Sequence, residues 1–255
     1  MKHVPRKRFG QHFLADQGVI AGILAAVSLR PGEHIAEIGP GEGALTDQLV
    51  KQADVLHVIE IDRDLAAALR QRFPPERLVV HEGDALAFDY ARLPAPLRLV
   101  GNLPYNISTP LLFHLLNYAE RFSDLTFMLQ REVVERMVAS PSGPEYGRLS
   151  VMLQYRYDME MLLTVPPEAF RPPPKVESAI VRLRPRPASQ LLARDAQTLG
   201  RVVTAAFTQR RKTLRNALGK LIGEDGLRRL GIDPGLRPEN LSVADYVAIS
   251  NSLAA

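Results

Sequence analysis

Three short polar segments, each directly after an apolar β-rich run, have the residue types that bind an adenosine cofactor. The first, EIGPGEGALT, carries Gly39, Gly41 and Gly43, which let the backbone approach a ligand with no Cβ in the way. Glu60 ends the next run, about 20 residues after Gly39, where a carboxylate accepts hydrogen bonds from both ribose hydroxyls. Asp84 ends the third run, where its carboxylate can accept from an exocyclic adenine amine. Together these segments predict an adenosine-containing cofactor.

The glycine turn alone leaves the kind of cofactor open. Gly39, Gly41 and Ala44 also fit the dinucleotide fingerprint, and a glycine-rich turn can be a mere structural joint. Asp84 favours a different class of cofactor. A glycine turn, a carboxylate for the ribose and a carboxylate for the adenine amine, at three successive strand ends, resemble the S-adenosylmethionine-dependent methyltransferase fold. No pyrophosphate need be bound in that fold. S-adenosyl-L-methionine is therefore the expected cofactor and methyl donor.

A fourth segment, GNLPYNISTP, suits chemistry on the amine of adenine, which is a poor nucleophile because its lone pair is conjugated into the ring. The amide oxygen of Asn102 and the carbonyl of Leu103 can accept from its two hydrogens. Pro104 has no N–H and fixes its own φ, which helps present that carbonyl. Tyr105 offers a ring for stacking, worth about 1–3 kcal/mol per base. Catalysis would then consist of positioning and hydrogen bonding, without a strong general base.

The alternative for this segment is a capped turn that holds a tyrosine, with Ser108 or Thr109 as the helix cap and Pro110 as the first helical residue.

An adenine can reach such a pocket only if it is extruded from its stack. The proline-rich segment 166–183 can supply the wall opposite Tyr105 through Phe170, and Lys175 can meet a phosphate. The alternative for Phe170 is a core residue under a proline loop.

These segments need a framework in which successive strands end at one edge. Through residue 130, β-rich runs alternate with helical patterns at 43–53 and 63–73, which predicts a parallel sheet with helices on both faces. Two later runs, 155–165 and 176–183, have little helix between them and predict an antiparallel edge. The early runs are HIAEIG (34–39), VLHVIEID (55–62), RLVVHEGD (77–84), LRLVGN (97–102) and LTFMLQ (125–130).

A change of pattern near residue 186 divides the chain. The segment RLRPRPASQ combines prolines with polar residues and is the predicted linker. Beyond it helical patterns replace strands, and residues 202–223 have the spacing of one long helix. We therefore expect a Rossmann-like α/β methyltransferase domain over residues 1–186 and a small all-α domain over residues 187–255.

Charge is unevenly distributed along this chain of 255 residues, although its net value is only +4. Lys2, Arg6, Lys7 and Arg8 precede the first acid, and bases outnumber acids from Arg184 onward. The long helical pattern adds a basic side with Arg210, Arg211, Lys212 and Arg215. Two basic ends suit a polyanion such as nucleic acid, with solvated surface charge as the alternative.

Several classes of protein and site are disfavoured. The chain has no cysteine, which excludes disulfides and thiolate metal sites, and its six scattered histidines predict no metal site. The run VIAGILAAVSL after the basic start mimics a signal peptide, but Asp16 and Gln17 interrupt the approach and RPGEH replaces a cleavage site. No run reaches the roughly 18 apolar residues of a membrane span. We expect a cytoplasmic protein without membrane contact, and a monomer because no coiled coil or long apolar stripe is present.

The ordered set of motifs resembles the ribosomal RNA adenine dimethyltransferase family, most closely its bacterial small-subunit branch. The glycine turn is weakly specific alone, but the set runs nearly end to end. Its members are RFGQHFLAD (8–16), EIGPGEGALT (37–46), IEIDRDL (59–65), GNLPYNISTP (101–110), FMLQREVVERM (127–137), YGRLSV (146–151), FRPPPKVESAIVRL (170–183) and FTQRRKTLRNAL (207–218).

The resemblance implies an activity and a set of contacts. The activity is the transfer of two methyl groups to N6 of each of two adjacent adenosines in a hairpin near the 3′ end of small-subunit (16S) rRNA, on an immature 30S particle late in assembly. The implied cofactor contacts are His12, Leu14, Gly39, Glu60, Asp84 and Asn102, and the implied base contacts are Asn102, Leu103, Pro104, Tyr105 and Phe170. Position 12 is often Asn in the family, and either Asn or His12 can hydrogen-bond through its side chain or backbone. The basic helical tail would grip rRNA phosphates.

Three rival functions are compatible with parts of the sequence. The erythromycin-resistance type of dimethyltransferase acts on large-subunit rRNA, but YGRLSV and QRRKTLRNAL look like the small-subunit branch. A ribosome-assembly or RNA-binding factor with incidental methyl transfer is a second rival. A nicotinamide-linked oxidoreductase is the third, although no residue looks like a hydride-transfer acid or base.

Overall fold

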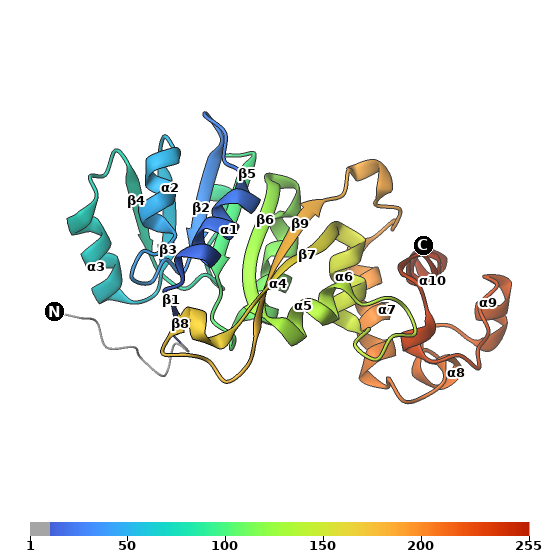
Figure 1. The fold of residues 1–255 in the computed structure, drawn as a ribbon. Helices are drawn as coiled ribbons and strands as arrows, with labels where there is room; N and C mark the ends of the chain where they lie inside the picture. Colours follow the sequence, from blue (N-terminus) through green and yellow to red (C-terminus); the bar gives the residue numbers. More distant parts are fainter. Residues whose placement is uncertain (1–10, 255) are drawn as a thin grey trace. The chain divides into compact units, whose positions relative to one another are not determined.

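A computed structural model describes residues 11–254, and the predicted basic start with Lys2, Arg6, Lys7 and Arg8 lies outside the described residues. The chain divides into two compact units (Figure 1). One unit comprises Met1–Val134 and Met159–Pro185, and the other comprises Glu135–Asp158 and Arg186–Ala255. The second unit thus includes a segment that the sequence analysis placed in the domain over residues 1–186.

The first unit is built on a seven-stranded sheet with the strand order β4-β3-β2-β5-β6-β9-β7. β2 to β6 pair in parallel, and β9 is antiparallel to β6. The predicted α/β class with a mostly parallel sheet and an antiparallel edge is therefore confirmed. The strands are β2 (His34–Ile38), β3 (Leu56–Glu60), β4 (Leu78–Glu82), β5 (Leu97–Asn102), β6 (Phe122–Gln130), β7 (Tyr157–Val165) and β9 (Ser178–Pro185), and a separate ribbon pairs β1 (Phe13–Leu14) with β8 (Phe170–Arg171).

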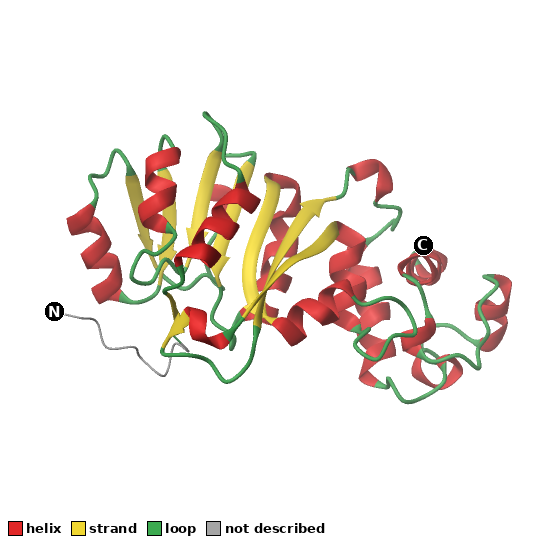
Figure 2. Cartoon of the chain, in the orientation of Figure 1, coloured by secondary structure: helices red, strands yellow, loops and turns green. Residues whose placement is uncertain are grey.

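Helices flank both sides of these strands (Figure 2). They are α1 (Gln17–Val27), α2 (Thr46–Gln52), α3 (Arg63–Arg72) and α4 (Ser108–Leu115), and a further helix, α5 (Arg131–Val138), directly follows β6 and is divided between the two units. The first three bury Ile23, Leu49 and Leu69 in one core with Val58 and Val100 of the sheet. Their apolar spacing therefore anchors them to the sheet.

The run that mimics a signal peptide forms α1, a helix with an ordinary cap. The Asp16 carboxylate accepts a hydrogen bond from the Val19 N–H at 2.9 Å, so the polar residues that interrupt the apolar run begin the helix. Within residues 11–254 no helix is both long enough and apolar enough to cross a membrane.

The start of α4 differs from the sequence prediction. The helix begins at Ser108 and has no side-chain cap, whereas a cap at Ser108 or Thr109 was expected. The turn closed by the Ile107 N–H and the Pro104 carbonyl already begins the helical path, and the Ser108 hydroxyl donates back to that carbonyl at 3.0 Å. The earlier start is a consequence of the compact turn after Pro104.

The second unit is helical around its own core, which contains Tyr146, Leu199, Val203, Leu214 and Tyr246. Its helices are α6 (Arg148–Arg156), α7 (Ala196–Thr208), α8 (Leu214–Ala217), α9 (Glu224–Arg229) and α10 (Val243–Leu253).

The single long helix predicted over 202–223 is wrong. α7 ends at Thr208, and α8 begins after a turn that carries Arg210, Arg211 and Lys212. The N–H groups of Leu214 and Arg215 donate to the carbonyls of Leu236 and Pro234 instead of continuing an uninterrupted helix. Three of the four residues of the predicted basic helix side therefore form an exposed basic turn, and the fourth, Arg215, is exposed in α8.

The strand order reverses between β2 and β5, whose carboxyl ends lie side by side. Ile38 pairs with Gly101 there, and a Cβ built on Gly101 would lie 2.5 Å from the Ile38 carbonyl oxygen. Only a glycine permits this close approach. Ligands of open α/β sheets bind in the crevice at such a switch point, so the fold places a site after these two strands.

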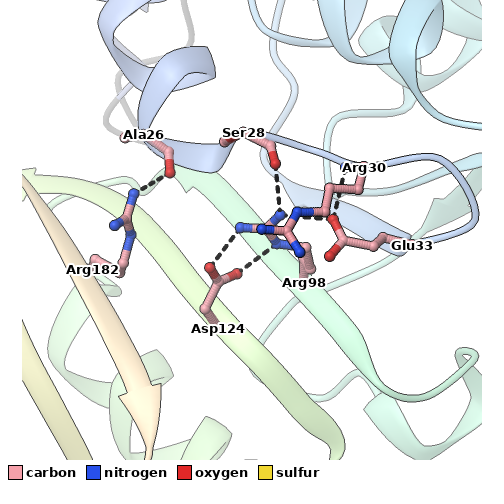
Figure 3. Close-up of polar contacts among 7 residues, drawn as sticks. All are labelled: Ala26, Ser28, Arg30, Glu33, Arg98, Asp124 and Arg182. Carbon is pink, nitrogen blue, oxygen red and sulfur yellow. Dashed lines mark hydrogen bonds and ion pairs between the residues drawn. The ribbon is translucent and has the colours of Figure 1, made fainter.

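An arginine cluster ties together the amino ends of the strands, away from that switch point (Figure 3). Arg98 of β5 makes two hydrogen bonds to Asp124 of β6 and a third, at 2.8 Å, to Glu33 before β2. Arg98 also donates to the Ser28 carbonyl after α1, and Arg182 donates to the Ala26 carbonyl. The cluster therefore neutralises the carbonyl end of α1 while joining two strands.

We expect Asp124→Ala to lower the free energy of unfolding by about 3 kcal/mol, because it leaves a nearly buried guanidinium without its two-bond partner. The side chains of Arg98 and Asp124 are only 12% and 13% exposed. Because Arg98 keeps its contacts with Glu33 and the Ser28 carbonyl, the loss should lie at the low end of the range for broken buried ion pairs. Urea denaturation measures the change. The matched control is Glu177→Ala, which breaks an ion pair with about half-exposed partners and should cost less than about 1 kcal/mol. Equal losses in the two variants would contradict the assignment.

Candidate active site

A cavity of about 280 Å³ lies at the carboxyl ends of β2, β3 and β5 in the first unit. Every candidate site residue except Phe170 lines it. These residues are His12, Leu14, Gly39, Glu60, Asp84, Asn102, Leu103, Pro104 and Tyr105. Residues from five separate segments of the chain therefore meet at one concave surface, as expected of a ligand site.

The glycine turn after β2 forms one wall of the cavity. Gly39 and Gly41 have φ values of +67° and +58°, which residues with a Cβ adopt only at a cost in conformational energy. The Gly39 N–H donates to the Ile59 carbonyl at 2.9 Å, and a Cβ on Gly41 would lie 3.0 Å from the Phe13 ring. Both glycines thus serve the turn geometry, and Gly41 also permits the close packing against β1.

Glu60 ends β3 and is almost fully buried. Its Oε1 accepts from the Asp62 N–H at 2.8 Å and its Oε2 from the Gly41 N–H at 3.2 Å. Burial raises the pKa of Glu60, and these backbone hydrogen bonds oppose the shift. A carboxylate has about four acceptor positions, and these two N–H donors use one on each oxygen. Each oxygen of Glu60 can therefore still accept a hydrogen bond from a hydroxyl group.

Asp84 follows β4 and faces the cavity from an exposed position. Its Oδ1 accepts from the Leu86 N–H at 2.9 Å, which fixes the carboxylate. Ile61, which is 44% exposed although apolar, and Ala85 line the same region. An acceptor beside apolar side chains matches the needs of a purine that carries an exocyclic amine.

Asn102 ends β5 with its side-chain amide held in one orientation. Its Nδ2 donates to the His12 carbonyl at 2.9 Å, so Oδ1 is the end of the amide that remains as an acceptor. Among residues 11–254, neither this Oδ1 nor the Leu103 carbonyl accepts a hydrogen bond from the protein. The Pro104 carbonyl differs, because it accepts from Ile107 and Ser108. Two neighbouring residues that line the cavity therefore each carry an acceptor oxygen that no donor within residues 11–254 occupies.

The Tyr105 ring lines the cavity and is held from two sides. Its hydroxyl makes a 2.7 Å hydrogen bond with the buried Ser178 hydroxyl, and burial raises the pKa of Tyr105. The His12 ring stacks on it with a centroid distance of 5.7 Å and an interplanar angle of 26°. This wall is a rigid aromatic surface.

Phe170 does not reach the cavity in this structure. It is 2% exposed and belongs to the core that contains Leu14 and Val165. Its backbone pairs with Leu14, which places β8 beside β1. This is the placement expected for a core residue under a proline loop, and Lys175 is exposed in that loop.

Glu37 is a cavity residue that the sequence analysis did not single out, although it lies two residues before Gly39. It is buried in β2 and accepts a hydrogen bond from the Thr46 hydroxyl at 2.7 Å. Burial raises the pKa of Glu37 to about 8, the Thr46 hydrogen bond opposes the shift, and the charges of Glu60 and Asp47 add to it. An acid inside an otherwise apolar strand was the signal that could have identified it. Over residues 11–254, no group of three or more histidine, aspartate or glutamate side chains could hold a metal ion.

The sequence matches the family described as ribosomal RNA adenine dimethylase over residues 2–255. It is 63% identical over 254 residues to a protein of Aromatoleum aromaticum named ribosomal RNA small subunit methyltransferase A, with 100% of this chain and 96% of the relative covered. A protein of Dechloromonas aromatica with the same name is 59% identical over 252 residues, with 99% of each chain covered.

Two solved structures share the fold. A dimethyladenosine transferase from Plasmodium falciparum superposes with a TM-score of 0.82 and 27% identity, covering 93% of this chain and 96% of that one. The 23S rRNA methyltransferase ErmE superposes with a TM-score of 0.74 and 28% identity, covering 94% and 99%. The similarity therefore extends well beyond the Rossmann-like sheet.

We expect Glu37→Gln to stabilise the protein increasingly as the pH rises from 5 to 8. The unfolded chain releases the Glu37 proton near pH 4.5, whereas the folded chain holds it to about pH 8, so the wild type loses stability as the pH rises through this window. The variant keeps an acceptor for Thr46 but has no proton to lose. Between pH 5 and 8 its advantage in free energy of unfolding should grow by up to about 4 kcal/mol.

Urea denaturation at several pH values measures this difference. Glu42→Gln is the matched control, because Glu42 is an exposed glutamate of the same turn. Parallel pH profiles for the wild type and Glu37→Gln would rule out the raised pKa.

Proposed function

The chain belongs to the ribosomal RNA adenine dimethylase family and is an S-adenosylmethionine-dependent enzyme that dimethylates adenines of small-subunit rRNA, and we propose how its cavity performs this reaction. The family and the activity predicted from the motifs are confirmed. We propose further that the targets are N6 of two adjacent adenosines in the 3′-terminal hairpin of 16S rRNA. The cytoplasmic enzyme acts as a monomer on an immature 30S particle, late in assembly.

The large-subunit alternative has less support. Curated relatives with 59–63% identity carry the small-subunit name, whereas ErmE, named for 23S rRNA, is 28% identical. This difference in identity favours the small subunit as the source of the substrate.

The cavity fits S-adenosylmethionine at its adenosine end. Glu60 accepts from the ribose hydroxyls through the lone pairs that Gly41 and Asp62 leave, and Asp84 accepts from the adenine amine. Ile61 and Ala85 line the cavity beside Asp84 and would cover the adenine ring. Gly39 leaves room for backbone approach, and His12 and Leu14, which also line the cavity, would contact the cofactor. When bound, S-adenosylmethionine supplies a methyl group on a sulfonium centre that is electrophilic without further activation.

The orientation of the Asn102 amide is the observation that carries the proposed mechanism. Its Nδ2 is committed to the His12 carbonyl, so Oδ1 and the neighbouring Leu103 carbonyl form a pair of acceptors. An adenine N6 amine has two hydrogens and matches this pair. Holding both hydrogens aims the nitrogen lone pair and favours rehybridisation as the N–C bond forms.

The remaining residues hold the base. Tyr105 stacks on one face of the extruded adenine, with its ring fixed by Ser178 and His12. Pro104 holds the turn that presents the Leu103 carbonyl. No strong general base is required, because the amine proton becomes acidic once the methyl group has transferred. Phe170 supplies the opposite wall only if the β1–β8 ribbon opens, since it is a core residue in this structure.

The helical unit grips rRNA through its exposed basic turn. Arg211 and Lys212 are exposed, whereas Arg210 donates to the Pro144 carbonyl and lies 3.9 Å from Glu239. The first two side chains are therefore the more available for phosphate contacts, which makes binding sensitive to salt.

We expect Asn102→Ala to fold normally and to lose methylation of immature small subunits by at least about 100-fold, because it removes an acceptor aimed at the reacting amine. The measurement uses labelled S-adenosylmethionine with small or large subunits from cells lacking the activity, followed by mapping of the label. Asn117→Ala, at an exposed position away from the cavity, is the control. Full activity of Asn102→Ala would remove the amine-holding mechanism, and label on large subunits alone would remove the 16S assignment.

We expect the double variant Arg211→Ala with Lys212→Ala to bind the immature particle more weakly and with a flatter salt dependence. Each lost phosphate contact should reduce the slope of log affinity against log salt by about 1. Filter binding over a series of KCl concentrations measures both quantities. Arg228→Ala is the control, since this exposed arginine pairs with Glu224 and Asp225. An unchanged slope would mean that the turn is solvated surface.

A further inference from the structure

His12 joins two segments that are distant in sequence. Its ring Nδ1 lies 2.8 Å from the Pro172 carbonyl, and because a carbonyl can only accept, Nδ1 carries the proton. Its backbone carbonyl accepts from Asn102 Nδ2 at 2.9 Å. The proline loop after β8 is therefore connected to the Asn102 amide through the two ends of one residue.

The His12 ring also stacks on the ring of Tyr105, which restrains it further. The two rings stack at 5.7 Å, and Tyr105 is fixed by its bond to the buried Ser178. Turning the ring away from Pro172 costs the hydrogen bond, and moving it out of its plane also costs the stacking on Tyr105. The position of its backbone carbonyl is thereby restrained.

We propose that His12 is a positioning residue for methyl transfer, which sets the orientation of the Asn102 amide while the Pro172 carbonyl holds His12 in place. This inference rests on the proposed role of Asn102 Oδ1 as an acceptor for the target amine.

The orientation of Asn102 needs such a partner because a side-chain amide can rotate by half a turn with almost no change in shape. In the reversed orientation Nδ2 would point at the amine, so that donor faces donor. The His12 carbonyl excludes that orientation, because two oxygens would then be in contact where a hydrogen bond now exists. Restraint of this carbonyl therefore keeps Oδ1 directed into the cavity.

The side-chain requirement at position 12 is an N–H donor at the δ position. Asn has such a donor at Nδ2, at the same number of bonds from Cα as histidine Nδ1. Ala has none, and Gln places its donor one carbon further away. The inference therefore orders the variants His12→Asn, His12→Gln and His12→Ala by donor position rather than by size.

The test measures single-turnover methylation of immature small subunits at saturating S-adenosylmethionine, together with cofactor affinity by calorimetry and the thermal midpoint. We expect His12→Ala and His12→Gln to lower the single-turnover rate about 10- to 100-fold, and His12→Asn to stay within about 3-fold of the wild type. Cofactor affinity should change less than the rate, because the adenosine contacts of Glu60 and Asp84 are retained. A residue needed only for folding would not give this split or the rescue by Asn.

Wild-type rates for His12→Ala and His12→Gln would overturn the inference, and so would an equal loss in His12→Asn, since the ring and not its donor would then be required. If His12→Ala does not fold, the comparison of the Asn and Gln variants still decides. Asn102→Ala is measured alongside. If it is active, the proposed function fails; if it is inactive while all His12 variants keep the wild-type rate, only the role of His12 fails.

Discussion

The contact between Gly101 and the Ile38 carbonyl is the constraint on which the site depends. A Cβ at position 101 would lie 2.5 Å from that oxygen, so β2 and β5 can run side by side to their ends only with glycine there. This pairing brings the glycine turn beside the segment that begins with Asn102, and a Cβ on Gly39 would lie 3.7 Å from the Asn102 carbonyl oxygen. The residues proposed to bind the cofactor and those proposed to bind the base are thus adjacent, because two parallel strands end together.

The charge of the cavity complements the cofactor proposed to bind in it. Burial raises the pKa of both Glu37 and Glu60, which means that the folded protein tolerates two acids in a poorly hydrated space. Hydrogen bonds from the Thr46 hydroxyl and from the N–H groups of Gly41 and Asp62 offset part of that penalty. S-adenosylmethionine carries a sulfonium, an ammonium and one carboxylate group, so its net charge is positive, and a cation bound near these acids would favour their ionised forms. The acids are therefore less costly in the complex than in the free protein.

Local patterns predicted the strands, the glycine turn and the cavity residues that follow strand ends, because strand alternation and turn chemistry depend on neighbouring residues. They failed where distant backbone groups decide the outcome. The break between α7 and α8 depends on the Leu214 N–H finding the Leu236 carbonyl, and the burial of Phe170 depends on its pairing with Leu14. The contacts of His12 span 90 and 160 residues, so spacing could not reveal them. Even the family resemblance left open how position 12 is used.

The amide at position 102 is determined by the contacts on both of its ends. Aspartate would fit the space, but it has no donor for the His12 carbonyl and would place a second oxygen against it. Aspartate would also carry a full negative charge beside Glu37 and Glu60, in a cavity where burial already opposes ionisation of both acids. Glutamine has both groups but is longer by one carbon, which would move its acceptor away from the Leu103 carbonyl. Among these three residue types, asparagine alone combines a donor for the His12 carbonyl, an acceptor for the proposed target amine and a short side chain. The polar residue at the end of β5 therefore follows from the geometry of its neighbours.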